Sequence, residues 1–574
     1  MLKSGRLDEA RVLCEKLCAR KGTGAEPLRL LGEIYNKQGR TADAIGCLHR
    51  AVQVAPDDAN TCALLADGLL HTGQYEQATE YYRKAISLAP GDPKRLANLA
   101  AILTGLHRPS EAEPLLREAV RINPKLSIPY ANLGSCLRAQ GRVEEALEWL
   151  EQGLAAAPDN PVMHSNYLLA RHYVANQDPQ ASLDAHIEWA RRHAPDTRQA
   201  HEFAGRDHGD RLRIGYVSPD FRTHSVAYFL APLFGNHDRK HFEIYCYSDV
   251  HSPDVMTQKL KGWVDCWRHV LNLGDEELDR RILADEIDIL VDLAGHTAGN
   301  RMRLFARRCA PVQLTWLGYP DTTGIGAMDY RVSDLHADPA GYEAYCSEKL
   351  IRLEGCFLCY EPSPDAPESA VAPFRENGFI TFGSFNNLSK INDEVVELWA
   401  GILRQVSGAR LVIKNPGLTD AVVRKDYLSR FAQCGVDDDR VILKGLSATT
   451  REHLGEYRHI DIGLDTFPYN GTTTTCEAMW MGVPVLTLTG GIHASRVGSS
   501  LLSAAGMERW IAGSPDDYVG LAVKYAGDVD FLEQQRDSLR DRMANSVLCD
   551  GVRFAAAMED VYRSAWQAWS GNNS

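Results

Sequence analysis

The pattern of hydrophobic and polar positions changes once along the chain, near residue 165. Before that point, apolar residues recur at helical spacing in a pattern that repeats every 34 residues. From about residue 210, short apolar runs of strand length alternate with longer amphipathic segments. The first part therefore predicts a helical repeat, and the second part predicts a mixed α/β fold.

Four columns of residues share the 34-residue period: prolines, glycines, alanines, and a leucine followed by a small residue. The proline column is Pro56, Pro90, Pro124 and Pro158. The glycine column is Gly39, Gly73 and Gly141, with His107 in the glycine place once. Small residues let two helices approach closely, glycine closes the turn between them, and proline ends the second helix.

In its period and its columns the segment resembles the tetratricopeptide repeat, a helix-turn-helix unit that stacks into a superhelix with a long groove. We expect residues 1–165 to form such a superhelix, with a truncated first repeat that includes Gly5 and Ala10 and about four further repeats. Residues 166–209 are expected to form a helical linker.

One more column has the same period and is expected to face the groove. It consists of Asn98, Asn132 and Asn166. Amide side chains can hydrogen-bond the backbone of a bound polypeptide. The alternative is that asparagine is merely common at this place in the repeat.

The second part of the chain contains two series of predicted strands. RLRIGYVS, HFEIYCYS and IDILVDLAG belong to the first series, expected over residues 210–361. A proline-rich connector is expected at 362–378, and FITFGSF, ARLVIKN, DRVILKG, IDIGLD and VPVLTLTG then form a second series within 379–574. Strands that alternate with helices predict two Rossmann-like halves, which bind ligands beyond the carboxyl ends of their strands.

Composition and charge narrow the range of functions. The 62 Lys and Arg against 76 Asp and Glu give a net charge of −14, so nucleic acid is not an expected partner. Neither a long apolar run nor a secretory signal is present, and the fourteen cysteines are scattered, which favours a cytoplasmic protein without a membrane span. The phosphate-loop, dinucleotide and HExxH motifs are absent, so kinase-type, dinucleotide-dependent and zinc-protease chemistry are disfavoured.

The most specific stretch is DIGLDTFPYNGTTTTCEAMWMGVPVL, residues 461–486. A strand is expected to end at Asp465, a turn to include Gly471, and the threonines from Thr472 onward to open a helix. The start of a helix offers unpaired N–H groups and the positive end of its dipole, and Thr473 and Thr474 add hydroxyl donors, which suits a diphosphate. Glu477, one turn later, is expected to accept hydrogen bonds from ribose hydroxyls. The alternative is an ordinary threonine-capped helix.

Three more stretches follow predicted strands. In TFGSFNNLSKI, Lys390 comes after a strand and a turn of small residues, where its ammonium group can neutralise a leaving phosphate. In YVSPDFRTHSVAYF, His224 lies just beyond the first strand. TWLGYPDTTGIGAMDY is a glycine-rich turn able to bring backbone amides near a sugar.

With these motifs the chain resembles the protein O-GlcNAc transferases that carry tetratricopeptide repeats, including the SPINDLY-like branch, over nearly its whole length. The resemblance implies a helical repeat solenoid followed by an α/β GT-B fold of two Rossmann-like domains, and an inverting reaction without a metal or other cofactor. It implies that Lys390, Thr473 and Thr474 contact the donor diphosphate, that Glu477 contacts the ribose, and that His224 acts as a base or orients the acceptor hydroxyl. The other donor contacts that it implies are Asn387, Ala448, His453, Gly471, Thr472, Leu317, Gly318 and Pro320.

Three of these positions depart from the family pattern: Asn387 stands where the animal enzymes have glutamine, Thr472 where those have histidine, and Glu477 where the family often has an aspartate, one methylene shorter. The implied activity is transfer of N-acetylglucosamine from UDP-GlcNAc to Ser or Thr hydroxyls of acceptor proteins held in the repeat groove by the asparagine column. The SPINDLY-like branch leaves open an O-fucosyltransferase that uses GDP-fucose. The sequence also leaves open a repeat scaffold with an inactive transferase region, and an enzyme whose acceptor is a glycan or small molecule.

Overall fold

The computed structural model describes residues 7–20, 22–175, 177–195, 203 and 211–572. The chain divides into two compact units, Met1–Ala157 and Pro158–Ser574. Among the described residues, no helix combines the length and the apolar character that crossing a membrane requires. These residues include all fourteen cysteines, and every one is a free thiol.

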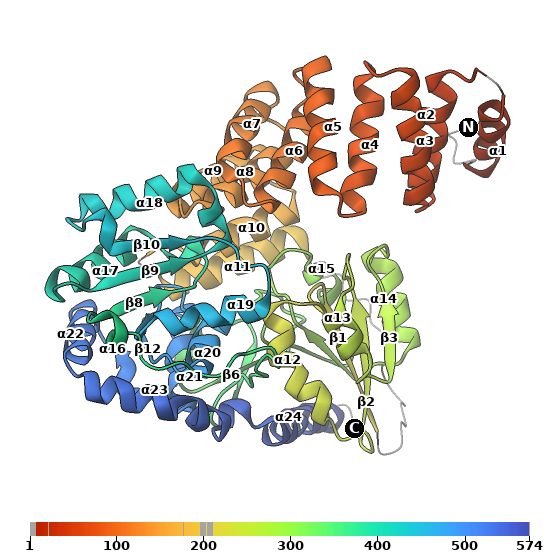
Figure 1. The fold of residues 1–574 in the computed structure, drawn as a ribbon. Coiled ribbons are helices and arrows are strands. Elements are labelled where there is room, and N and C mark those ends of the chain that lie inside the picture. The colour runs from red at the N-terminus through yellow and green to blue at the C-terminus, as the bar shows by residue number, and fades with distance from the viewer. Residues whose placement is uncertain (1–6, 21, 176, 196–202, 204–210, 573–574) are drawn as a thin grey trace. The chain divides into compact units, whose positions relative to one another are not determined.

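The first unit consists of helical hairpins stacked side by side, drawn in red and orange in Figure 1. Its helices are α1 (Leu7–Cys18), α2 (Ala25–Lys37), α3 (Thr41–Val54), α4 (Ala59–His71), α5 (Tyr75–Leu88), α6 (Pro93–Gly105), α7 (Pro109–Ile122), α8 (Ser127–Ala139) and α9 (Val143–Ala156). The hairpins repeat as the sequence predicts. Of the predicted truncated first repeat, Ala10 is buried in α1, whereas Gly5 lies outside the described residues.

Two of the repeating columns have direct structural causes. The glycine place in the hairpin turn has a positive φ, 73° at Gly39 and 59° at His107, so the histidine adopts the backbone that glycine favours. The small residue in the first helix allows close helix contact: a Cβ on Gly32 would stand 2.5 Å from Cγ of Leu48. Each repeat thereby packs its second helix tightly against its first.

The second unit begins with a helical hairpin, α10 (Pro161–Arg171) and α11 (Pro179–His193). The predicted boundary between residues 165 and 166 falls inside α10, which groups with the second unit. Trp189 of α11 is buried and packs edge-on against His296 of the first α/β half, with ring centroids 4.6 Å apart. The segment predicted as a linker is therefore packed, where it is described, as part of the α/β unit.

The first α/β half holds a seven-stranded sheet whose strands all run parallel, in the order β3-β2-β1-β4-β5-β6-β7. Its strands are β1 (Leu212–Ser218), β2 (Phe242–Ser248), β3 (Cys266–His269), β4 (Ile289–Asp292), β5 (Val312–Thr315), β6 (Tyr330–Asp334) and β7 (Lys349–Leu353). The helices between them are α12 (Ser225–Asn236), α13 (Val255–Lys261), α14 (Asp275–Ala284) and α15 (Met302–Phe305). β1 pairs with both β2 and β4, so the strand order reverses between β1 and β4.

The second half holds a six-stranded parallel sheet in the order β10-β9-β8-β11-β12-β13. Its strands are β8 (Thr381–Ser384), β9 (Arg410–Lys414), β10 (Val441–Lys444), β11 (Ile462–Leu464), β12 (Val485–Leu488) and β13 (Ile511–Ala512). Its helices are α16 (Phe374–Asn377), α17 (Asp393–Gln405), α18 (Ala421–Gln433), α19 (Thr450–Gly455), α20 (Thr473–Trp480), α21 (Val497–Ala504), α22 (Pro515–Ala526) and α23 (Val529–Ala544). The order reverses between β8 and β11, and both halves thus have the strand order of a Rossmann fold.

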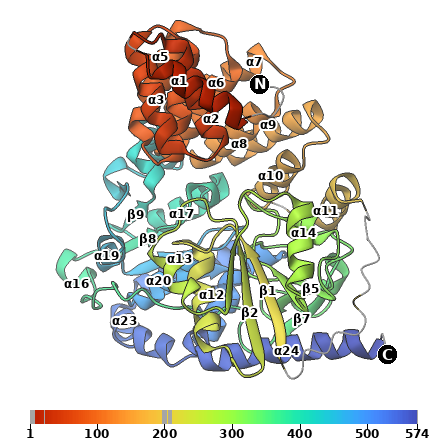
Figure 2. The same ribbon diagram turned by 90° about the vertical axis from the view of Figure 1, so that its right-hand side faces the viewer.

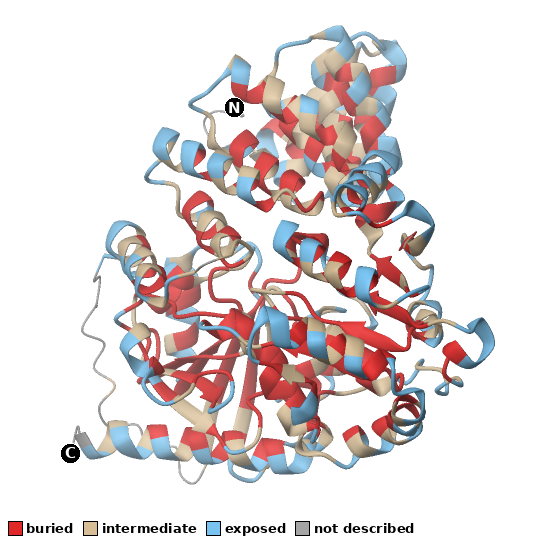
Figure 3. Ribbon diagram, turned by 90° about the vertical axis from the view of Figure 1, so that its left-hand side faces the viewer, coloured by how far each residue is buried: buried red, intermediate tan, exposed pale blue. Residues whose placement is uncertain are grey.

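Both sheets lie between helices, and their central strands appear mostly red in the burial colouring of Figure 3, whereas the edge strand β3 has no buried residue. The apolar runs RLRIGYVS, HFEIYCYS and ARLVIKN supply such central strands, which confirms the parallel two-sheet α/β fold.

The last helix, α24 (Gly551–Asn572), leaves the second half and packs on the first (Figure 2). Tyr562 of α24 lies 2.8 Å from the hydroxyl of Tyr216 in β1, and Oε1 of Glu559 accepts a hydrogen bond from the backbone N–H of Asp238. The predicted second half, residues 379–574, therefore contains a helix that completes the first half.

Candidate active site

Most of the residues predicted to bind the sugar nucleotide or to act in catalysis follow strands next to the two points where strand order reverses. These points lie between β1 and β4 and between β8 and β11. His224 follows β1, and the glycine-rich loop of residues 317–320 follows β5, two strands away in the same sheet. Lys390 follows β8, and the turn that leads to α20 follows the neighbouring β11. Crevices at such reversals are the usual ligand sites of open parallel sheets.

In the second half, the loop after β8 and the start of α20 meet at Gly471. Thr474 Oγ1 donates a hydrogen bond of 2.8 Å to Oδ1 of Asn386. A Cβ on Gly471 would stand 2.7 Å from Thr474 Oγ1 and 3.0 Å from that Asn386 oxygen. Only glycine leaves the room for these two segments to come together.

The first turn of α20 has the features of an anion site. Thr472 occupies the N-cap position and makes no side-chain capping bond. The Thr473 hydroxyl is buried and has no hydrogen-bond partner among the described residues. A buried polar group normally has a partner, so this unpaired donor beside the unpaired N–H groups of a helix start marks a place for a ligand.

Lys390 stands beside this helix start. Its Nζ donates a hydrogen bond of 2.7 Å to the carbonyl of Asn470 and lies 3.9 Å from the centre of the Tyr469 ring. Burial lowers the pKa of Lys390 to about 8, and the nearby carboxylate of Asp465 opposes that shift. The ammonium group is held in place with little solvent around it, which strengthens its attraction for an anion.

Asp465 fixes the turn between β11 and α20. Its Oδ1 accepts hydrogen bonds from the backbone N–H groups of Gly471 and Thr466, at 2.6 and 2.8 Å, and its Oδ2 accepts one from the Thr487 hydroxyl. Burial raises the pKa of this carboxyl to about 6. Sequence patterns alone do not single out Asn386 or Asp465, although Asn386 directly follows a predicted strand and Asp465 ends one, so both occupy the edge where ligands bind.

A second polar cluster surrounds Glu477 of α20. Nδ1 of His453 accepts a hydrogen bond of 2.7 Å from Lys414, and Nε2 lies 3.3 Å from Oε2 of Glu477. The His453 ring also packs against Phe385, with ring centroids 5.6 Å apart. The structure thus brings together His453 and Glu477, both predicted to bind the sugar nucleotide. It adds Lys414, at the end of β9, which the sequence does not single out.

Two other predicted donor contacts have local partners. Asn387 is exposed, and its Oδ1 accepts from the backbone N–H of Ser389, which caps the short turn that leads to Lys390. The backbone N–H of Ala448 donates to Glu452, 3.0 Å away, ahead of α19. Their contacts to a nucleotide stay predictions.

His224 is the N-cap of α12 and is half-buried. Its Nδ1 accepts a hydrogen bond of 3.3 Å from the backbone N–H of Val226 and lies 3.7 Å from a carboxylate oxygen of Asp220. Burial lowers the pKa of His224, with the Asp220 charge acting in the opposite direction. An imidazole that is neutral near pH 7 can accept a proton.

The two halves approach each other near this histidine. Tyr228 lies one turn further along α12, and the charge of Glu477 in α20 raises its pKa in addition to the effect of burial. The backbone N–H of Glu361, directly before the connector, donates to the carbonyl of Tyr228. α12 and α20 therefore face a common region.

The loop with Leu317, Gly318 and Pro320 has a strained and crowded backbone. Leu317 has a φ of 74°, and a Cβ on Gly318 would stand 1.8 Å from the carbonyl oxygen of Leu293. The loop is therefore pressed against the turn that follows β4.

The side chain of Tyr319, within this loop, ties it to the α10–α11 hairpin. Its buried hydroxyl lies 3.0 Å from Nε2 of His172 and 2.8 Å from Nε2 of His186. Nδ1 of His186 donates to the carbonyl of Ser182, so its Nε2 is the acceptor of the Tyr319 proton, and His172 is the donor to the same oxygen.

His172 and His186, together with Asp321, form the group with metal-ligand geometry among the described residues; their ligand atoms all lie within 4.8 Å of one another. Their donor and acceptor atoms already serve the Tyr319 hydroxyl and Ser182, whose Oγ donates 2.5 Å to Asp321. Hydrogen bonding accounts for the arrangement of this cluster.

The asparagine column is divided between the two units. In the first unit, Asn98 donates to the Tyr82 hydroxyl at 3.0 Å and Asn132 to the carbonyl of Ala97 at 3.1 Å. Asn166 belongs to α10 in the second unit and lines a cavity there. A role of the column in holding an acceptor stays a prediction.

Comparison with known proteins agrees with this architecture. The sequence model of glycosyl transferase family 41 matches residues 170–361 and 374–558, and tetratricopeptide repeat models match residues 25–91, 69–133 and 103–171. A structural neighbour, a lysine-to-methionine mutant of the O-GlcNAc transferase of Thermobaculum terrenum, has a TM-score of 0.85 and 37% identity, covering 90% of this chain and 98% of that one. The fold and these matches define a glycosyltransferase that carries tetratricopeptide repeats. The chain belongs to glycosyl transferase family 41.

Plant relatives have longer chains. The tomato protein named probable UDP-N-acetylglucosamine–peptide N-acetylglucosaminyltransferase SPINDLY is 42% identical over 417 residues, 72% of this chain and 45% of its own length. The Arabidopsis thaliana protein of the same description with the name SEC is 32% identical over 368 residues, 62% of this chain and 37% of its own. The chain thus spans less than half the length of these relatives.

Proposed function

We propose that this protein transfers N-acetylglucosamine from UDP-GlcNAc to Ser or Thr hydroxyls of proteins, with inversion at the anomeric carbon. The acceptor oxygen attacks that carbon while the bond to UDP breaks, and the bonding electrons leave with the diphosphate. The observation that carries the proposal is the junction at Gly471, where the Lys390 ammonium group and the unpaired Thr473 hydroxyl stand beside the start of α20.

That junction supplies what the departing UDP requires. Negative charge develops on the diphosphate as the bond breaks, and preorganised donors lower the barrier most when they are aimed at that charge in a site with little water. A half-buried ammonium group, a hydroxyl and the positive end of a helix dipole provide this stabilisation together. We therefore propose that the reaction proceeds without a metal ion.

His224 is proposed to receive the acceptor proton or to orient the hydroxyl. Its lowered pKa keeps the ring neutral near pH 7, and its Nδ1 is held by the Val226 N–H, which directs the ring. The loop of residues 317–320 is proposed to contact the sugar, and the hydrogen bonds of Tyr319 hold this loop in place. The repeats of the first unit are proposed to bind acceptor proteins.

The cluster around His453 is proposed to hold the nucleoside. In this proposal Glu477, whose Oε2 lies 3.3 Å from Nε2 of His453, accepts from ribose hydroxyls, and the His453 ring, packed on Phe385, contacts the base. A second candidate function is that of a SPINDLY-like O-fucosyltransferase, which would use GDP-fucose as the donor. It is kept because the chain is 42% identical to a SPINDLY relative and 32% identical to the SEC relative.

Two labelled donors test the proposal. Purified protein is incubated with UDP-GlcNAc or GDP-fucose, each labelled in the sugar, and a pool of Ser- and Thr-containing peptides; labelled peptide and free nucleotide are measured. Transfer from UDP-GlcNAc supports the proposal, and transfer from GDP-fucose alone replaces it with the second candidate. Absence of transfer and of nucleotide release from both donors would show a scaffold instead.

A further inference from the structure

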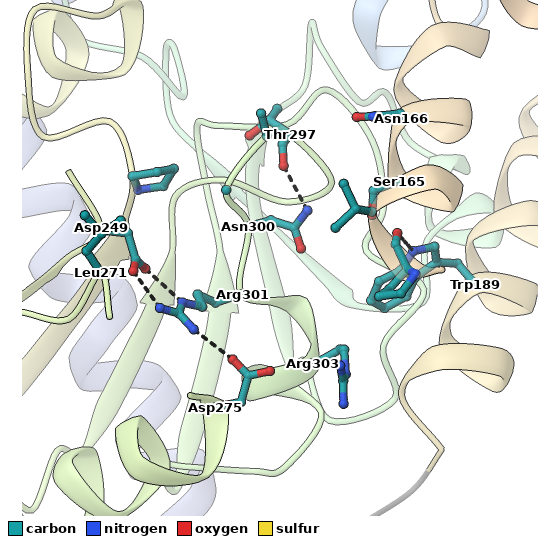
Figure 4. Close-up of a pocket in the computed structure, with 15 residues that line it drawn as sticks. Ser165, Asn166, Trp189, Asp249, Leu271, Asp275, Thr297, Asn300, Arg301 and Arg303 are labelled. Atoms are coloured by element: carbon teal, nitrogen blue, oxygen red, sulfur yellow. Dashed lines mark hydrogen bonds and ion pairs between the residues drawn. The ribbon is translucent and has the colours of Figure 1, made fainter. Parts of the chain in front are cut away.

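The cavity that Asn166 lines has a volume of about 360 Å³ and lies in the first α/β half, at the carboxyl ends of β1 to β4 and against α10 and α11 (Figure 4). The loops after these four strands reach it through Pro219, Asp249, Leu271 and residues 297–301, respectively. None of the proposed donor-binding residues lines it. Its size is in the range of small-ligand sites in proteins.

The framework of the cavity is rigid. Arg301 donates to both carboxylate oxygens of Asp249, at 3.0 and 2.6 Å, to Asp275, and to the backbone carbonyls of Leu273 and Val270. On the opposite wall, Trp189 donates to the carbonyl of Pro161 at 3.1 Å. With its hydrogen-bond donors so engaged, Arg301 holds the cavity open without being free to bind a ligand.

Two polar side chains at the cavity are not held by hydrogen bonds in this way. Asn166 and Arg303 make no hydrogen bond or ion pair with any residue in the part of the chain that the structure describes, and Arg303 is exposed. Beside them, the aliphatic side chains of Val162 and Leu271 are 63% and 41% exposed. The cavity therefore offers an amide, a guanidinium group and an apolar wall.

This combination selects a class of ligand. A diphosphate is disfavoured because Arg301 is neutralised by two carboxylates. A sugar ring usually packs on an exposed aromatic face, whereas Trp189 is only 1% exposed. An extended polypeptide suits the three features: its backbone pairs with an amide, its apolar side chains pack on an aliphatic wall, and an acidic side chain pairs with a guanidinium group.

The position of the cavity relates it to the proposed catalytic histidine. Pro219 lines the cavity, and a Cβ on Gly299 would stand 3.0 Å from its Cβ, so the loops after β1 and β4 touch there. His224 follows Pro219 by five residues, which span at most about 18 Å. A polypeptide in the cavity would therefore lie within about five extended residues of a hydroxyl at His224.

We propose that this cavity is an acceptor subsite in which Arg303 selects a carboxylate within about five residues of the modified hydroxyl. The inference rests on the proposed transferase function and goes beyond it, because it predicts which acceptor sequences are preferred. Asn166, expected from the sequence to hold an acceptor together with the first unit, lines this cavity.

The test measures acceptor preference in the full chain. Peptide pools with one fixed serine carry glutamate, glutamine or lysine at each position up to five residues away, and label transfer is compared between pools. We expect the wild type to prefer glutamate to lysine about tenfold at one or two neighbouring positions, and Arg303→Glu to reverse that preference. The matched control is Arg280→Glu, an exposed arginine in α14 outside the cavity, which should keep the wild-type preference.

A second variant fills the cavity. Val162→Trp should lower kcat/KM for the preferred peptide about tenfold, whereas release of UDP in the absence of peptide should stay unchanged. Val422→Trp is the control, because Val422 is 60% exposed and lies in α18, away from the cavity.

Failure of the subsite and failure of the transferase function give different results. The subsite is overturned if wild type and Arg303→Glu transfer sugar with the same position-specific preferences. It is also overturned if Val162→Trp keeps full activity on the peptide. Either result leaves the transferase function standing. A wild type that neither transfers sugar to any pool nor releases nucleotide overturns the transferase function, and the acceptor role of the cavity with it.

Discussion

The hydroxyl of Thr474 donates a hydrogen bond of 2.8 Å to the side-chain oxygen of Asn386, and so ties the first turn of α20 to the loop that carries Lys390. Asn386 is buried, whereas its neighbour Asn387 is exposed. The two parts of the proposed diphosphate site come from segments almost ninety residues apart, and this bond sets their separation.

Removal of this bond should weaken donor binding. Asn386→Ala leaves the Thr474 hydroxyl without its partner and frees the loop of Lys390, at a cost of about 1–3 kcal/mol, so we expect UDP affinity to fall about tenfold or more. Isothermal titration calorimetry with UDP measures the change. Asn545→Ala, which removes an exposed amide bonded to the carbonyl of Asp541 in α23, is the control; equal losses in both variants would contradict the role given to Asn386.

A side chain at residue 471 should separate the same two segments. In Gly471→Ala the new methyl group would stand 2.7 Å from the hydroxyl oxygens of Thr474 and Thr475, so α20 has to shift away from the β8 loop. We expect loss of measurable turnover, with the helical content retained by circular dichroism. Gly455→Ala, where nothing lies within 4 Å of the added carbon, should be active; turnover in Gly471→Ala close to wild type would show that the junction tolerates more space than the structure indicates.

The pH dependence of donor use follows from Lys390. Its pKa of about 8 means that the ammonium form is lost as pH rises through that value, so kcat/KM for the donor should fall above about pH 8. Below neutrality, His224 becomes protonated at a pH under its ordinary 6.5, and the rate should fall again there. In Lys390→Arg, whose side chain stays charged, the alkaline fall should disappear from whatever activity remains; an unchanged alkaline limb would assign that titration to another group.

Stability of the unliganded protein should show the opposite trend. Between about pH 8 and 10.5 the unfolded chain holds the Lys390 proton and the folded protein does not, so this group makes unfolding less favourable as pH rises through that window. Denaturant titrations at several pH values should show this gain in wild type and not in Lys390→Met.

Loss of the Tyr319 hydroxyl should disturb the loop beside the sugar. Tyr319→Phe leaves Nε2 of both His172 and His186 buried without a partner, which costs about 1–3 kcal/mol for each. We expect a lower melting temperature and a higher KM for the donor. Tyr245→Phe, which loses a hydroxyl bonded to Glu243 at 3.1 Å on β2, is the control; a donor KM raised equally by both changes would argue against a special role of the loop.

The sequence was sufficient for the repeats because each column has a local cause, such as the positive φ of the hairpin turn. It was also sufficient for the central strands, which are continuous apolar runs. Two strands without a continuous apolar run have no such signal: β3, at the edge of its sheet, reads CWRH, and β6, between β5 and β7, reads YRVSD. In both, polar residues interrupt the apolar pattern, and pairing with neighbouring strands decides the conformation. The return of α24 to the first half is a long-range contact and has no local signal.

The site shows the same division. Lys390, Thr473 and Thr474 could be predicted, because a strand end followed by a turn and a helix start can be recognised in one continuous stretch. Asn386, Asp465 and Lys414 could not be ranked as candidates, since what distinguishes them is a contact with a segment far away in sequence. The 34-residue period predicts that Asn166 faces the repeat groove, although its helix α10 belongs to the α/β unit.

A structure of the protein with bound UDP-GlcNAc tests the central claim most directly. The account predicts the diphosphate at the start of α20, within hydrogen-bond distance of the Thr473 hydroxyl and the Lys390 ammonium group. A diphosphate bound elsewhere, with the Thr473 hydroxyl still unpaired, would contradict it.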